Sequence, residues 1–104
     1  MKALRMTFDD SYSNNLDELL DAVSDARSFL EFVKALVADR VDEVIKEKEK
    51  PSNPYAAGAN GWEHGTIEDY LDAAVAWAED SQMLPEKPSW KTFAEFLYRG
   101  KHYE

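Results

Sequence analysis

The two histidines, His64 and His102, are the side chains of this 104-residue chain best suited to proton transfer near neutral pH. Nucleophilic catalysis needs such a base beside a serine, threonine or cysteine. The chain has no cysteine and no Gly-x-Ser-x-Gly motif. A phosphate loop is also absent, because no Lys-Ser or Lys-Thr pair directly follows Gly58, Gly61 or Gly65. We therefore expect no catalytic residue and no enzymatic activity.

Four potential metal ligands lie close together in the sequence: Glu63, His64, Glu68 and Asp69. Their spacing differs from that of His-Glu-x-x-His, which places two imidazoles one helical turn apart. Acidic residues at a helix start are explained by the helix dipole, which attracts negative charge. We expect no metal and no cofactor.

The long polar loop of residues 51–65 and the acids that follow it are the predicted contact surface for a partner. Aromatic residues are unusual among Pro, Gly and Asn unless they bind something or pack onto the core. For Trp62, a lid on the core is the alternative to an exposed anchor. The candidate binding residues are Tyr55, Asn60, Trp62, Glu63, Glu68, Asp69 and Asp72.

The negative charge of the chain is unevenly distributed. With 21 acidic and 12 basic residues the net charge is −9, which disfavours binding to nucleic acid or to anionic membranes. Residues 63–80 hold six acids and no base, whereas residues 87–101 hold four bases and one acid. Such a segment is either a solvated helix face or a surface complementary to a basic protein.

Helical periodicity dominates the chain and predicts an all-α fold, a small bundle of three or four helices or an orthogonal array. Asn15 and Glu18 form a predicted capping box for a first helix ending near Val23. A second helix is expected over residues 25–50, in one piece or broken near residues 38–40, and it stops at Pro51.

Two further helices are predicted after the loop, capped by Thr66 and by Ser89, with Gly100 as the stop signal of the last. Trp77 is expected beside the buried stripe of the first of them. The expected inward-facing residues are Ile67, Tyr70, Leu71, Ala74, Val75 and Ala78 in one helix, and Trp90, Phe93, Ala94, Leu97 and Tyr98 in the other.

These helices form one predicted domain, residues 15–104, and residues 1–14 are a tail or a docked extended segment. An α+β fold is the alternative, with strands in residues 2–8 or a hairpin near Trp62. No export signal is visible, and the longest apolar run is the six residues 73–78, so we expect a cytoplasmic protein.

Several phrases of the sequence resemble a known family: SFLEFV at residues 28–33, GANGWE at 58–63, TIEDYL at 66–71 and AWAED at 76–80. The family consists of small, uncharacterised bacterial proteins, a domain of unknown function. The resemblance covers residues 16–104 and implies a bacterial, single-domain protein. It implies no activity.

We therefore predict a non-enzymatic, acidic, protein-binding domain whose partner is a basic protein, similar by analogy alone to immunity proteins and antitoxins. The chain is expected to be a monomer or a weak homo-oligomer, in the latter case through a surface at Trp77 and Trp90. The alternative from another class is a small-molecule-binding or enzymatic domain with a pocket formed by Trp62, Glu63 and His64.

Overall fold

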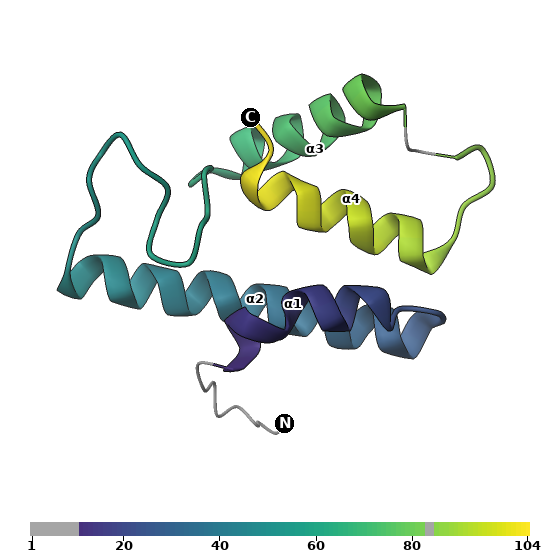
Figure 1. Cartoon of the computed structure of the whole chain (residues 1–104), viewed down its shortest axis with the longest axis horizontal. Helices are drawn as coiled ribbons and strands as arrows, with labels where there is room; N and C mark the ends of the chain where they lie inside the picture. Colours follow the sequence, from purple (N-terminus) through teal and green to yellow (C-terminus); the bar gives the residue numbers. More distant parts are fainter. Residues whose placement is uncertain (1–10, 83–84) are drawn as a thin grey trace.

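The computed structural model describes residues 11–82 and 85–104, with side chains from residue 16 onward. It contains four helices: α1 (Ser11–Asp21), α2 (Ala26–Glu49), α3 (Ile67–Ser81) and α4 (Trp90–His102). These residues contain no strand, which confirms the all-α prediction. Figure 1 shows α1 and α2 as one pair, α3 and α4 as a second pair, and the long loop leading from the end of α2 to α3.

Capping residues explain where three of the helices begin. Asp25 and Ser28 form a capping box, in which the Asp25 carboxylate accepts a hydrogen bond from the Ser28 N–H at 2.9 Å. Thr66 and Ser89 cap α3 and α4 as predicted. Helix α2 runs uninterrupted for 24 residues.

Helix α1 begins at Ser11, so the predicted start at Asn15 is wrong by four residues. Residues 11–14 are helical and not extended, because adding a turn to a nucleated helix costs little. The predicted tail over residues 1–10 and the possible strand in residues 2–8 lie outside the described residues.

Helix α4 lies at the centre of the fold, in contact with the other three helices. The core consists of apolar side chains from α1, the connection to α2, α2 itself, α4 and the long loop: Leu16, Leu20, Val23, Phe32, Ala35, Leu36, Trp62 and Ala94. Among the four helices, α3 packs against α4 alone. No helix in the described part of the chain is both long and apolar enough to cross a membrane.

The predicted inward stripe of α3 is confirmed for Tyr70 and Ala74 but wrong for Ile67, Leu71 and Val75. Ala73, Ala74 and Trp77 are buried, whereas Ile67 is 76% exposed. Leu71 and Val75 are also exposed, and Trp77 is buried instead of flanking the stripe. The reason is close packing: the face of small residues allows α4 to approach, and the larger aliphatic residues are turned away from it.

Gly100 explains how near the two helices come. A Cβ atom at this position would lie 2.8 Å from the main-chain oxygen of Tyr70 and 2.8 Å from its ring. The predicted role of Gly100 as a helix stop is therefore wrong, because α4 continues to His102. In the first turn of α4, Trp90 and Phe93 are partly exposed and contact the ring of Phe29, so their predicted burial is wrong.

Candidate functional site

The long loop is attached to the helices by a buried ion pair. Lys101 of α4 lies 2.7 Å from the carboxylate of Asp39 on α2, and both side chains are buried. The same Asp39 oxygen accepts a hydrogen bond from the indole N–H of Trp62 at 2.8 Å. The indole therefore belongs to the core, and the lid alternative for Trp62 is correct.

A second buried carboxylate, Glu43 on α2, holds the backbone of the same loop. It accepts hydrogen bonds from the N–H groups of Asn60 at 2.9 Å and Trp62 at 3.2 Å, and from the Arg40 guanidinium at 2.9 Å. A Cβ at Gly58 would clash with this carboxyl, so a larger residue there would require the Glu43 carboxylate to shift. Each backbone N–H of residues 58–62 donates a hydrogen bond, and three of these bonds go to Glu43 or Glu47 of α2. The backbone of residues 58–62 is therefore fixed against α2.

Further hydrogen bonds hold the beginning and the turn of the loop. The Asn60 amide donates to Asp42 and to the main-chain oxygen of Asp39, both at 3.0 Å. The hydrogen bonds that Asp42 accepts from Asn60 and Lys46 lower the pKa of Asp42. Hydrogen bonds from Ser52 lower the pKa of Glu47 in the same way. The chain turns at residues 59–60, where the Gly61 N–H donates to the Gly58 carbonyl at 2.9 Å, and Gly61 has a φ of 91° that favours glycine.

The candidate residues predicted in the loop therefore divide into two kinds. Asn60 and Trp62 hold the loop in place. Tyr55 is 97% exposed, and Glu63 is exposed, with its pKa raised because its carboxyl shares a hydrogen bond with that of Glu104. The structure thus keeps Tyr55 and Glu63 available for contacts.

The three remaining candidates, Glu68, Asp69 and Asp72, are exposed on α3. Glu68 and Asp72 are four residues apart and so share a helix face. Glu79 continues their row, and no acid of this row takes part in an ion pair within the described ranges. The row borders the exposed apolar residues of α3.

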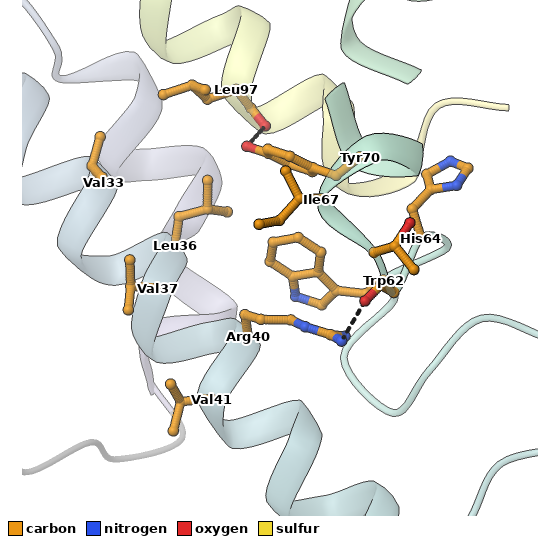
Figure 2. Close-up of a pocket in the computed structure, with 12 residues that line it drawn as sticks. Val33, Leu36, Val37, Arg40, Val41, Trp62, His64, Ile67, Tyr70 and Leu97 are labelled. Atoms are coloured by element: carbon orange, nitrogen blue, oxygen red, sulfur yellow. Dashed lines mark hydrogen bonds between the residues drawn. The ribbon is translucent and has the colours of Figure 1, made fainter. Parts of the chain in front are cut away.

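Between α2 and α3 lies an apolar groove of about 360 Å³ (Figure 2). Valines of α2 form one wall, Ile67 and Tyr70 of α3 form the other, and Leu36 and Leu97 contribute from the core side. Trp62 stands between Arg40 and Ile67 (Figure 2). The lining residues are Val33, Leu36, Val37, Arg40, Val41, Trp62, His64, Gly65, Thr66, Ile67, Tyr70 and Leu97.

The polar side chains at the groove are already engaged within the protein. Arg40 donates to Glu43, and its guanidinium carbon lies 5.5 Å from the centre of the Trp62 ring. The Tyr70 hydroxyl donates to the Leu97 carbonyl at 2.7 Å, and burial raises the pKa of Tyr70 to about 12. The His64 ring lies 2.7 Å from the Tyr103 carbonyl and is directed away from the valines (Figure 2). The groove therefore presents mainly hydrocarbon.

Exposed aliphatic side chains continue along both helices beyond the groove lining. On α2, Leu30 and Val44 share a helix face with the lining residues Val37 and Val41, and on α3, Leu71 and Val75 follow Ile67 at helical spacing. Single exposed aliphatic residues are ordinary, but a continuous patch between two helices is typical of a binding surface. We therefore regard the groove as the candidate functional site.

The model of a family of unknown function, DUF7660, matches residues 25–104. The chain belongs to DUF7660. The expected membership of a domain of unknown function is thereby confirmed. The DUF7660 match contains α2, the loop, α3 and α4, which are all the elements of the groove, and leaves out α1. Searches of curated proteins and of solved structures gave no match.

The sequence interpretation missed the buried polar residues and the groove. One signal was available for the first: Asp39 and Glu43 continue the inward spacing of Phe32 and Leu36, so two carboxylates occupy core positions of α2. For the groove, the signal was an excess of aliphatic residues, since α2 carries more of them than one buried face can hold.

Proposed function

We propose that this protein is a non-enzymatic domain that binds another protein in the groove between α2 and α3. The observation that carries the proposal is an apolar groove lined by exposed valines of α2 and by Ile67 of α3, two helices that do not pack against each other. Burial of apolar area gives about 25 cal/mol per Å², so such a surface favours a partner that covers it.

The proposal moves the predicted contact surface. Trp62 no longer serves as an exposed anchor, because its indole is held by Asp39. The acids Glu68 and Asp72 remain, at the outer edge of the groove. A basic partner and a bacterial cytoplasm, both expected from the sequence, remain parts of the proposal.

Affinity capture with matched variants tests this function. The groove variant combines Val37→Asp with Ile67→Asp, and each substitution places a charge in the groove. Because Val37 is 57% exposed and Ile67 is 76% exposed, folding should be preserved. Tyr55→Asp is the control, because its side chain is exposed in the loop outside the groove.

We expect the wild type and Tyr55→Asp to recover the same protein from a lysate of the source cells, and the groove variant to lose it. Rebinding of the purified partner to each variant should give the same order. Loss of the partner in Tyr55→Asp alone would instead support the loop surface, and equal recovery by all three would refute the groove as the site.

A second candidate function is binding of a small apolar molecule. The groove volume of about 360 Å³ falls within the range of ligand pockets, and both Trp62 and His64 line it, although the exposed Glu63 does not. Thermal shifts with a panel of small apolar compounds distinguish this candidate, which predicts stabilisation of the wild type and none of the groove variant.

A further inference from the structure

The occupant of the groove can be described by the shape and charge of its two walls. Helix α3 has only α4 as a helical neighbour, and α2 is packed by α1 and α4 on other sides. Neighbouring helices pack at about 8–10 Å between axes, so a helix lying along both walls would complete the packing of α3. This step rests on the proposed function.

The length of the apolar walls sets the length of the occupant. The groove lining on α2 runs from Val33 to Val41, and exposed aliphatic residues on the same helix face continue it to Leu30 and Val44, which at a rise of about 1.5 Å per residue are about 21 Å apart. A helix of about 15 residues, roughly four turns, spans this distance. Its apolar residues would follow the helical spacing of i, i+3 or i+4, and i+7.

The charges beside the two walls differ in sign. Glu68, Asp72 and Glu79 form an acidic row beside the aliphatic residues of α3, which has no basic residue. On α2, Lys34 and Lys48 are exposed at positions that share the face of Leu30 and Val37. The two walls therefore favour an occupant that places basic side chains over α3 and acidic side chains over α2.

We infer that the groove receives an amphipathic helix of a different protein, with an apolar ridge and a basic edge that faces α3. A second copy of this chain is a poorer match, because each copy carries a net charge of −9 and like-charged molecules repel.

Designed peptides test the inference with the full chain. One fluorescent 16-residue peptide carries a leucine ridge with lysines along one edge, and its partner peptide has glutamate in place of each lysine. At low salt we expect the basic-edged peptide to bind about tenfold tighter, because a few exposed charge pairs each contribute a few-fold. At high salt the ratio should fall toward one.

Two charge variants locate the preference. Glu68→Lys with Asp72→Lys should reverse the ratio, whereas Glu18→Lys with Asp21→Lys makes the same charge change on α1 and should leave the preference for the basic peptide. Equal binding of both peptides, or equal effects of both variants, would overturn the inference.

Sedimentation and the captured partner separate a failure of the helical occupant from a failure of the proposed function. If neither peptide binds, and sedimentation shows a dimer that Ile67→Asp dissociates, the occupant is a second copy and the inference is wrong. If neither peptide binds but the captured partner still requires Val37 and Ile67, the function stands and the helical occupant is refuted. If the peptides bind as expected and the captured partner does not need these residues, the proposed function fails.

Discussion

Removal of the Lys101 ammonium should expose how strongly the buried ion pair holds the loop. In Lys101→Met the methionine retains most of the apolar stem, but the Asp39 carboxylate loses its charge partner at 2.7 Å and keeps the indole N–H of Trp62. Breaking a buried pair by removing one member costs about 3–5 kcal/mol, because a charge is left uncompensated. The free energy of unfolding should fall by that amount.

Urea unfolding followed by circular dichroism measures this loss. With a slope of about 1.5 kcal/mol per molar urea, the midpoint should fall by about 2–3 M. Lys48→Met is the matched control, because the Lys48 side chain is exposed on α2 and its replacement should change stability by less than about 0.5 kcal/mol.

A second variant separates the cost of losing the charge partner of Asp39 from the cost of lost packing. Asp39→Asn with Lys101→Met removes both charges, and an asparagine oxygen can still accept the hydrogen bond from Trp62. The double variant should be more stable than Lys101→Met alone. A cost below about 1 kcal/mol for Lys101→Met, similar to that of Lys48→Met, would refute the reasoning.

Three further predictions concern the packing that forms the groove. Gly100→Ala should lower the free energy of unfolding by about 1–3 kcal/mol in urea titrations, because the new methyl group meets the Tyr70 backbone. The control, Gly65→Ala, should be nearly neutral, because the nearest atom to its new methyl group lies at 3.8 Å. Equal effects of the two substitutions would contradict the close helix contact. Trp62→Phe should cost about 1–3 kcal/mol because Asp39 loses a donor, and a neutral result would argue against that hydrogen bond. The pKa values of Asp42 and Glu47 are lower in the folded protein than the values of about 3.9 and 4.3 expected in the unfolded chain. The two carboxylates therefore contribute stability above these unfolded pKa values, and this stability is lost as the pH falls through the folded pKa values. Unfolding titrations from pH 3 to 6 should therefore show a smaller acid loss for Asp42→Asn with Glu47→Gln than for the wild type, and identical pH curves would contradict this role.

Much of the fold could be predicted because local signals decide it. The caps at Asp25, Thr66 and Ser89 satisfy free N–H groups within their own turns, so the sequence alone locates these helix starts. The inward register of α3 could not be predicted in the same way. Its apolar residues cover more than one face, and the choice depends on the close approach of Gly100 in α4.

The candidate site was predictable only in part for the same reason. The acids of α3 are exposed as helical spacing suggests, but the role of Trp62 depends on Asp39 and Lys101, which are 23 and 39 residues away in sequence. Helical spacing indicates that Asp39 lies inward, but the partners that it contacts there, Trp62 and Lys101, leave no local pattern. The groove likewise arises from the arrangement of α2 and α3 around α4, which no single helix determines.

The most direct test of the groove as a protein-binding site uses the two isoleucines of the chain, Ile45 and Ile67. Ile67 lines the groove and Ile45 lies outside its lining, so methyl-labelled protein gives one reporter of each kind. On addition of the purified, captured partner, the Ile67 methyl resonance should shift more than that of Ile45, and Val37→Asp should abolish the shift. An unchanged Ile67 resonance in a saturated complex would contradict binding in the groove.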